Sequence, residues 1–253
     1  DLDDLEDVFH HVIDWAIEFK RLWGSGDEVV RNFMPLDVMT VGCIYEKPST
    51  RTRVSFEVGI ARLGGSPLTL LKNDIQLGSS ESIEDTSRVL SRFLGAITYR
   101  CHGHADVVAL AEASEVPVIN ALSDTHHPCQ AAADLMAVKE VFGEERVRIA
   151  WVGDGNNVLH DLMLAGVMLG HDVVWATPPG YEPNQDVVDR AQAIAERTGA
   201  TLQATNDPVE AVSGAHVIYT DVFISMGEEH LTDKVQAFDG RSEEHTSELQ
   251  SPD

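Results

Sequence analysis

The chain has 253 residues, of which 43% are hydrophobic, and this is enough for one large domain or for two of ordinary size. Its 42 acidic and 18 basic residues give a formal net charge of −24, which argues against binding to nucleic acid or to anionic membranes, because both need a basic face. No apolar run approaches 18 residues and the acidic N-terminus lacks a signal-peptide pattern, so we expect neither a membrane span nor a secretion signal.

In the first half of the chain, helical and strand patterns alternate. Apolar residues at helical spacing predict a helix over 4–24, and the β-branched run 38–45 predicts a buried strand. Two apolar stripes then predict a helix over 52–63 that is buried over much of its surface. The remaining patterns predict strands at 66–71, 95–100 and 116–121, and helices at 81–94, 105–114 and 127–143.

The same alternation starts again at residue 148. It predicts strands at 148–154, 172–178, 201–206 and 216–221, and helices at 156–169, 184–198 and 207–213. Strands and helices that alternate through short connections imply parallel sheets with helices on both faces. The predicted fold class is therefore α/β with two parallel domains, residues 1–143, in which 127–143 is a connecting helix, and residues 144–240.

Residues 241–253, RSEEHTSELQSPD, break this pattern because they are polar and contain only one large apolar residue, Leu249. A disordered tail is one interpretation. The stretch also resembles the translation of a common sequencing-library adapter. We expect that it is non-native and that the second domain is incomplete.

Lysine and cysteine content bear on the cellular setting. Only five residues are lysine, and an acidic, lysine-poor surface is typical of halophile proteins, such as those of haloarchaea, whose salty cytoplasm screens self-repulsion. An ordinary acidic bacterial protein is the alternative. Cys43, Cys101 and Cys129 are odd in number and lack CxxC spacing, which indicates a reducing cytoplasm.

The stretch EKPSTRTRVSFE, residues 46–57, places a positive cluster in this acidic chain. It lies between a predicted strand and a predicted helix, where α/β proteins bind ligands. The helix start offers free N–H groups, and the side chains that suit a phosphate beside it are Ser49, Thr50, Arg51 and Thr52.

Arg53 points away from Arg51 on a helix, so we expect it to form a structural ion pair instead. The alternative to an anion site is a capped helix with two solvated arginines. The P-loop signature G-x-x-x-x-G-K-[ST] is absent, so the predicted anion site is of another kind.

Six motifs in order resemble the aspartate/ornithine carbamoyltransferase family, and the first looks like the form in ornithine carbamoyltransferases. They are EKPSTRTRVSFE, ESIEDTSRVLSRF (81–93), YR (99–100), HPCQ (127–130), GDGNN (153–157) and DVFISMGEE (221–229). The resemblance spans roughly residues 5 to 235. It implies one α/β domain for carbamoyl phosphate and one for the amino acid, with the active site between them.

The resemblance also implies residue roles. The carbamoyl phosphate-binding residues would be Ser49, Thr50, Arg51, Thr52, Gln76, Arg100, His127 and Gln130. Among these, Arg51, Arg100 and His127 would be catalytic, because they would stabilise the charge that develops on a tetrahedral oxyanion. The ornithine-binding residues would be Asn157, Asp221, Ser225 and Met226. Gln76 matches a glutamine that reaches into a neighbouring subunit, which implies a homotrimer or a multiple of trimers.

The implied reaction transfers the carbamoyl group of carbamoyl phosphate to the δ-amine of L-ornithine, giving citrulline and phosphate in arginine metabolism. The resemblance implies no metal and no organic cofactor. Anabolic and catabolic directions use the same residues. Aspartate as the acceptor is disfavoured because the loop 76–82 lacks the lysine expected there, and putrescine is the runner-up.

Three other interpretations compete. GDGNN could open a dinucleotide site, but Val158 replaces the last glycine of G-x-G-x-x-G. CHGH (101–104) and the pair at 126–127 suggest a metal site, but a structural zinc site needs four ligands at set spacing. Because no HCLP stretch of the family follows, we also expect the chain as written to be poorly stable and nearly inactive; a paralogue that only binds carbamoyl phosphate is the alternative.

Overall fold

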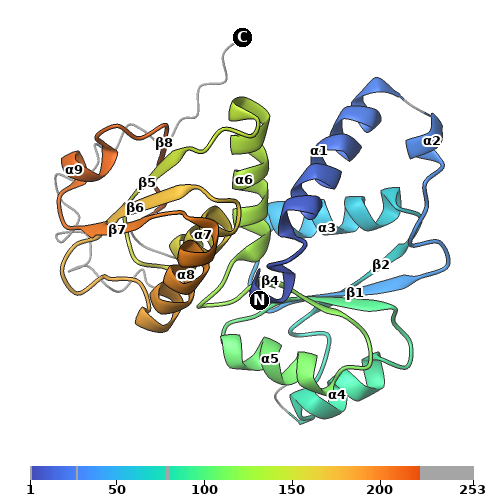
Figure 1. Cartoon of the computed structure of the whole chain (residues 1–253). Coiled ribbons are helices and arrows are strands. Elements are labelled where there is room, and N and C mark those ends of the chain that lie inside the picture. The colour runs from blue at the N-terminus through green and yellow to red at the C-terminus, as the bar shows by residue number, and fades with distance from the viewer. Residues whose placement is uncertain (1, 27, 78–79, 223–253) are drawn as a thin grey trace. The chain divides into compact units, whose positions relative to one another are not determined.

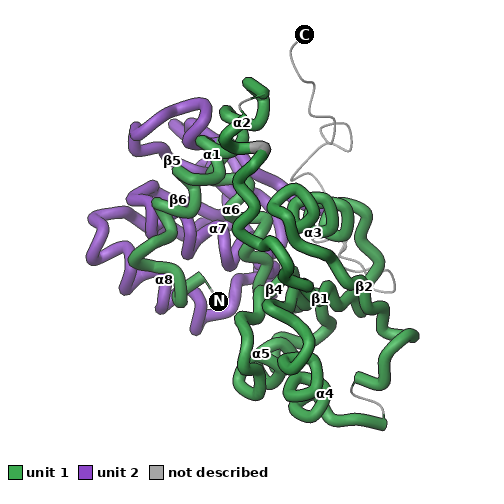
Figure 2. The backbone as a smooth tube through the Cα atoms, turned by 90° about the vertical axis from the view of Figure 1, so that its right-hand side faces the viewer, with its two compact units in different colours: residues 1–137 green, residues 138–253 purple. Residues whose placement is uncertain are grey.

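The computed structural model describes residues 2–26, 28–77 and 80–222. The chain divides into two compact units, residues 1–137 and residues 138–253, coloured green and purple in Figure 2. Each unit contains a four-stranded parallel sheet, with strand orders β2-β1-β3-β4 and β7-β6-β5-β8 (Figure 1). This confirms the predicted fold class of two parallel α/β domains.

Unit 1 alternates strands and helices after an N-terminal helical segment. Its elements are η1 (Leu2–Leu5), α1 (Phe9–Ser25), α2 (Glu28–Arg31), β1 (Thr40–Tyr45), α3 (Thr50–Arg62), β2 (Ser66–Leu71), α4 (Ile83–Leu90), β3 (Ala96–Arg100), α5 (His104–Ala113) and β4 (Val118–Leu122). Helix α6 (Pro128–Phe142) begins in unit 1 and ends in unit 2. In Figure 1, α4 and α5 lie on one face of the sheet and α3 on the other.

Strand β1 shows why this sheet is buried on both sides. Cys43 and Tyr45 pack with Ile60 of α3, whereas Ile44 packs with Leu110 of α5. Successive side chains of a strand point to opposite faces, so a strand with helices on both sides is apolar throughout. The continuous apolar run that predicted this strand is therefore the direct result of its central place in the sheet.

Unit 2 repeats the architecture with β5 (Arg148–Val152), α7 (Asn157–Met168), β6 (Asp172–Ala176), α8 (Gln185–Thr198), β7 (Leu202–Thr205), α9 (Pro208–Val212) and β8 (Val217–Tyr219). Helix α7 is buried along nearly its whole length. Its Gly166 lies so close to β6 that a Cβ there would meet Val173 at 2.9 Å. On the other face of the sheet, Ala150 and Val174 pack against Ala211 of α9. No helix in the described part of the chain is long and apolar enough to cross a membrane.

Most predicted elements are present, with bounds that differ by a few residues, but three details were wrong. The first helix does not start at residue 4, because η1 and a turn precede α1. The i, i+3 spacing of Leu2 and Leu5 fits a 3₁₀ turn as well as an α-helix, so periodicity could not separate them. The strand begins at Thr40 and not at residue 38, because Val38 has a positive φ of 59° and is almost fully exposed.

The third error concerns α3, which is less buried than its two apolar stripes predicted. Ile60 is buried and Phe56 packs beside it on the sheet. On the opposite side of the helix, Val54 and Val58 are 54% and 41% exposed. Only the stripe that contains Phe56 and Ile60 therefore packs against the sheet. The short helix α2 was not predicted at all.

Gly155 provides a test of the packing that holds the loop between β5 and α7. Its N–H donates to the carbonyl oxygen of Tyr181 at 2.9 Å, and an added Cβ would lie 2.3 to 2.6 Å from backbone atoms of residues 181–183. Backbone cannot move aside cheaply, so we expect Gly155→Ala to lower the free energy of unfolding by about 1–3 kcal/mol. Urea denaturation followed by circular dichroism measures it.

Gly24→Ala is the matched control, because a Cβ at Gly24 of α1 meets nothing within 4 Å. Alanine favours a helix over glycine, so this variant should keep or gain stability. Equal stabilities of the two variants would contradict the packing described for Gly155.

Candidate active site

The predicted carbamoyl phosphate-binding residues of unit 1 follow three strands that are neighbours in its sheet. Residues 46–52 follow β1, Arg100 ends β3, and His127 lies in the connection after β4. The chain leaves β1 towards β2 on one side and leaves β3 towards β4 on the other. This is a topological switch point, where open α/β sheets bind ligands at the carboxyl ends of their strands.

The start of α3 forms the first part of the site. Ser49 has extended backbone and caps the helix, because its Oγ accepts a hydrogen bond from the N–H of Thr52 at 3.2 Å. Thr50 and Arg51 are exposed at this end of a 13-residue helix. The positive end of the helix dipole adds to the charge of Arg51, so this segment is suited to an anion.

Arg53 is the second arginine of the motif, and its predicted structural ion pair is confirmed. Its Nε contacts Oε1 of Glu57 at 2.8 Å, one helical turn further on. The hydroxyl of Thr69 on β2 donates to the same carboxylate oxygen. Thr69 first, and Arg53 second, hold the pKa of Glu57 below its usual range. Glu57 therefore ties α3 to the edge strand β2 through Thr69, and its carboxylate neutralises Arg53.

Arg100 provides a buried positive charge between the two other segments. Only 4% of the residue is exposed, and its Nη1 lies 3.4 Å from the Oγ1 of Thr52. Its Nε is buried without a hydrogen-bond partner among the described residues. Burial lowers the pKa of Arg100, but an arginine starts so high that it stays charged at neutral pH. A buried donor without a partner is costly, so it indicates a site for an acceptor.

His127 precedes α6 and carries a second buried polar atom. Its carbonyl accepts from the N–H groups of Gln130 and Ala131, while its Nδ1 is buried without a described partner. Burial first, and the charge of Arg100 second, lower the pKa of His127 to about 4, so the imidazole is neutral at pH 7. Gln130 lies one turn along α6, where its Nε2 donates to Oδ1 of Asp134 at 2.9 Å.

Gln76 lies apart from these residues on the connection between β2 and α4. Its side chain is exposed, and its Oε1 accepts a hydrogen bond from the hydroxyl of Ser80 at 2.9 Å. Within unit 1, the structure places Gln76 on a surface loop.

In unit 2, polar residues follow the neighbouring strands β5 and β8. Asn156 caps α7, because its Oδ1 accepts from the N–H groups of Val158 and Leu159 at 3.0 and 3.2 Å. Its Nδ2 donates to Oδ2 of Asp221 at 3.4 Å. Asp221 also accepts from the N–H of Val222, so its carboxylate is held in place with acceptor capacity left over.

Sequence reasoning missed Asn156. It selected Asn157, which is the first residue of α7 and is half-buried. The available signal was the preference for asparagine just before a helix, which makes the first asparagine of GDGNN the capping candidate. The cap also uses N–H groups at the helix start that the pyrophosphate of a dinucleotide would need. This disfavours the interpretation of GDGNN as a dinucleotide site. Ser225 and Met226 lie outside the described residues.

Cys101 and His104 of the CHGH stretch contact nearby protein atoms. The thiol of Cys101 is buried against the carbonyl of Gly103, and Nδ1 of His104 lies 3.0 Å from the hydroxyl of Ser123. Among the described residues, no group of three or more histidine, cysteine, aspartate or glutamate side chains is placed to hold a metal ion.

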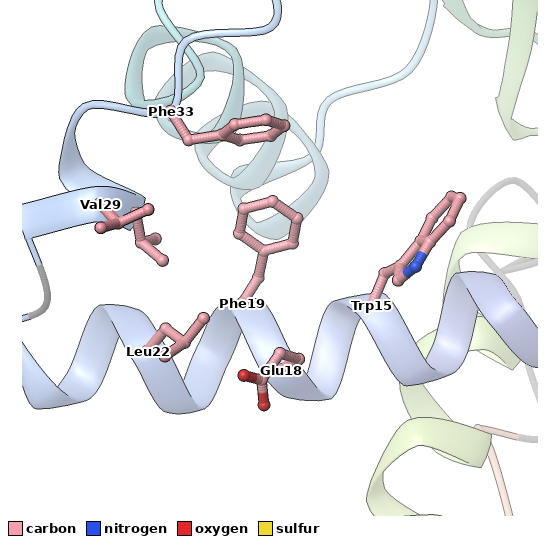
Figure 3. Close-up of a pocket in the computed structure, with 7 residues that line it drawn as sticks. Trp15, Glu18, Phe19, Leu22, Val29 and Phe33 are labelled. Atoms are coloured by element: carbon pink, nitrogen blue, oxygen red, sulfur yellow. The ribbon is translucent and has the colours of Figure 1, made fainter.

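A separate pocket of about 200 Å³ lies beside α1 (Figure 3). Its walls are formed by Trp15, Glu18, Phe19, Leu22, Val29, Val30 and Phe33. The rings of Phe19 and Phe33 face each other with centroids 5.4 Å apart, and the one charged group, Glu18, is bonded to Arg21. The residues that line the pocket include no basic side chain, and none of them belongs to the predicted site.

The chain matches two family models that together cover most of its length. Residues 1–140 match the carbamoyl-P binding domain of aspartate/ornithine carbamoyltransferase, and residues 145–242 match the Asp/Orn binding domain. It is 48% identical over 227 residues to the catabolic ornithine carbamoyltransferase of Thermoplasma acidophilum, covering 89% of this chain and 72% of that one. It is 49% identical over 217 residues to the anabolic ornithine carbamoyltransferase of Pyrococcus furiosus, covering 85% and 69%.

Solved structures agree with the sequence relatives. The ornithine carbamoyltransferase structure from Pyrococcus furiosus superposes with a TM-score of 0.85 at 46% identity, covering 92% of this chain and 75% of that one. The structure of a mitochondrial ornithine carbamoyltransferase from Coccidioides immitis gives a TM-score of 0.84 at 38% identity, covering 92% and 76%. The chain belongs to the aspartate/ornithine carbamoyltransferase family.

Proposed function

We propose that this protein is an ornithine carbamoyltransferase, which transfers the carbamoyl group of carbamoyl phosphate to the δ-amine of L-ornithine. The observation that carries the proposal is a pair of buried polar atoms, Nε of Arg100 and Nδ1 of His127, that have no hydrogen-bond partner in the described part of the chain. They lie beside the capped start of α3. The family domains bind carbamoyl phosphate and aspartate or ornithine, and the relatives and solved structures named above are ornithine carbamoyltransferases.

In unit 1, the proposed ligand is carbamoyl phosphate. Its phosphate binds the N–H groups and hydroxyls of Ser49, Thr50 and Thr52, together with the guanidinium of Arg51. Arg100 bridges the phosphate and the carbonyl oxygen, and Gln130 and neutral His127 hydrogen-bond the carbamoyl group. Gln76 completes the set from a neighbouring subunit. Support comes from the strand order, because three of these segments lie at the carboxyl ends of the neighbouring strands β1, β3 and β4.

In unit 2, the proposed ligand is the amino-acid end of ornithine. The anchored carboxylate of Asp221 pairs with the α-ammonium, and Asn157 hydrogen-bonds the same end of the substrate. Asn156 acts through Asp221 by fixing the carboxylate, as its 3.4 Å contact suggests. Ser225 and Met226 complete the proposed set on the basis of the family resemblance alone.

The reaction follows from these two half-sites. The lone pair of the neutral δ-amine attacks the carbonyl carbon and forms a C–N bond, and the carbonyl electrons move to oxygen. When the oxyanion collapses, the bond from carbon to the phosphate oxygen breaks, and the nitrogen loses a proton. The products are citrulline and phosphate. Arg51, Arg100 and His127 stabilise the negative charge that develops, and holding both substrates supplies proximity. No step requires a metal or an organic cofactor.

The oligomeric state and the cellular environment of the protein are also part of the proposal. We propose a homotrimer, or a multiple of trimers, in a salty cytoplasm. Exposed Gln76 and the exposed stripe of Val54 and Val58 on α3 support a subunit contact, and the net charge of −24 supports salt dependence. Sedimentation in dilute and in molar salt tests the trimer and its salt dependence. A monomer at every salt concentration would contradict the trimer.

Side-by-side assays of ornithine, putrescine and aspartate as acceptors test the function. Because Asp221 can pair with an α-ammonium next to a carboxylate, we expect product only with ornithine, measured as citrulline and released phosphate. Faster turnover with putrescine would favour the runner-up. Binding of carbamoyl phosphate without turnover of any acceptor would favour either the nearly inactive chain expected from the sequence or a paralogue that only binds this ligand.

The two arginines of the motif form a matched pair for mutagenesis. We expect Arg51→Ala to lower kcat/KM for carbamoyl phosphate by about 100-fold or more, because it removes a charged donor to the transferring group. Arg53→Ala should change kcat/KM by less than about threefold and cost only a few tenths of a kcal/mol, as about half-exposed ion pairs do. Steady-state kinetics and thermal denaturation measure both. Similar losses of activity in the two variants would contradict the assignment.

The lowered pKa of His127 predicts a pH effect on stability. An unfolded histidine titrates near 6.5 and the folded one at about 4, so between these values the unfolded chain binds more protons. The contribution of His127 to the free energy of unfolding is therefore complete above pH 6.5 and is lost as the pH falls towards 4. Between pH 7.5 and 5.5, the free energy of unfolding of the wild type should fall by about 1 kcal/mol more than that of His127→Gln. Urea titrations at both pH values measure this, and parallel losses would contradict it.

A further inference from the structure

Glu46 is a buried carboxylate at the carboxyl end of β1 that the proposed mechanism does not use. Only 7% of its side chain is exposed. It directly precedes the segment 47–52 that contains the proposed phosphate-binding residues. A negative charge in this place works against binding an anion, so its presence needs a physical reason.

Two contacts of Glu46 flank Cys101, the residue that follows Arg100. Its backbone N–H donates to the carbonyl oxygen of Arg100 at 2.9 Å. Its Oε2 accepts a hydrogen bond from the backbone N–H of His102 at 2.8 Å. One residue thus holds the chain at the positions before and after Cys101, where β3 ends and the next loop begins.

The other carboxylate oxygen reaches Lys72, the residue that directly follows β2. Oε1 of Glu46 lies 3.4 Å from Nζ of Lys72, whose backbone N–H donates to the carbonyl oxygen of Tyr45. Lys72 is about half exposed and offsets part of the buried charge. Burial first, and the Glu46 carboxylate second, raise the pKa of the Tyr99 hydroxyl on β3. The ends of β1, β2 and β3 therefore meet at one side chain.

We propose that Glu46 is a positioning residue for the proposed reaction: its carboxylate oxygen, by accepting the N–H of His102, fixes Arg100 relative to the phosphate-binding segment. This role rests on the proposed function of that site. Arg100 has a single described hydrogen bond from its side chain, to Thr52, so its place depends on the backbone that carries it. A displacement of about 1 Å in such a group can lower a rate by about 100-fold.

Two variants separate the reach of the side chain from its charge. Glu46→Gln keeps an oxygen at the same distance from the backbone and loses the charge, and Lys72 can turn to solvent. Glu46→Asp keeps the charge and moves the oxygen back by one methylene. If the hydrogen bond to His102 positions Arg100, the glutamine variant should behave like the wild type and the aspartate variant should not.

Three measurements test this. Calorimetry gives the affinity for carbamoyl phosphate and for inorganic phosphate, kinetics with ornithine give kcat and KM, and hydrogen exchange reports the protection of the His102 amide. We expect Glu46→Asp to weaken binding of carbamoyl phosphate by about 10-fold to 100-fold and to lower kcat, with loss of protection at His102. Glu46→Gln should stay within about threefold of the wild type in binding and should keep the protection. KM for ornithine should be unchanged in both variants.

Asp172→Asn is the matched control. This carboxylate holds Arg146 and the N–H of Thr201 in unit 2, so its loss should lower stability without weakening phosphate binding. Affinity that is unchanged in Glu46→Asp, or lowered equally in Glu46→Asp and Glu46→Gln, would overturn the positioning role. Failure of the wild type to bind carbamoyl phosphate would instead overturn the proposed function, and the role of Glu46 with it.

Discussion

The order of four parallel strands in unit 1 is the constraint on which the rest of the site depends. With β1 and β3 at the centre, their carboxyl ends lie side by side, and the connections that leave them run in opposite directions. The strand order therefore brings together Arg51, Arg100 and His127, which are far apart in the sequence. Arg100 is buried at the end of β3, which lies between β1 and β4 in the sheet.

Local signals in the sequence predicted most of this arrangement. The apolar runs gave the strands, since a strand buried on both faces is apolar at every position, and residues such as Ser49 marked helix starts. Arg51, Arg100 and His127 were found through motifs that follow strands. Their roles are supported by the resemblance and by the geometry of unit 1 together.

What the sequence could not predict depended on contacts between distant residues. Val54 and Val58 are exposed because the sheet packs against only one of the two apolar stripes of α3, which periodicity cannot reveal. Val38 has a backbone conformation that β-branched residues rarely adopt, so propensity pointed the wrong way. The buried partner of the His102 N–H was equally invisible, because Glu46 is 56 residues earlier in the chain.

The separate hydrogen-bond networks of the two units have a consequence for how such an enzyme changes over time. Arg100 and Thr52 contact each other within unit 1, whereas Asn156 and Asp221 contact each other within unit 2. With Asp221 in its proposed role, substitutions around it can alter which amine is accepted while the bonds around Arg100 stay intact. A duplicated gene can explore new acceptors and inherit the carbamoyl donor chemistry unchanged.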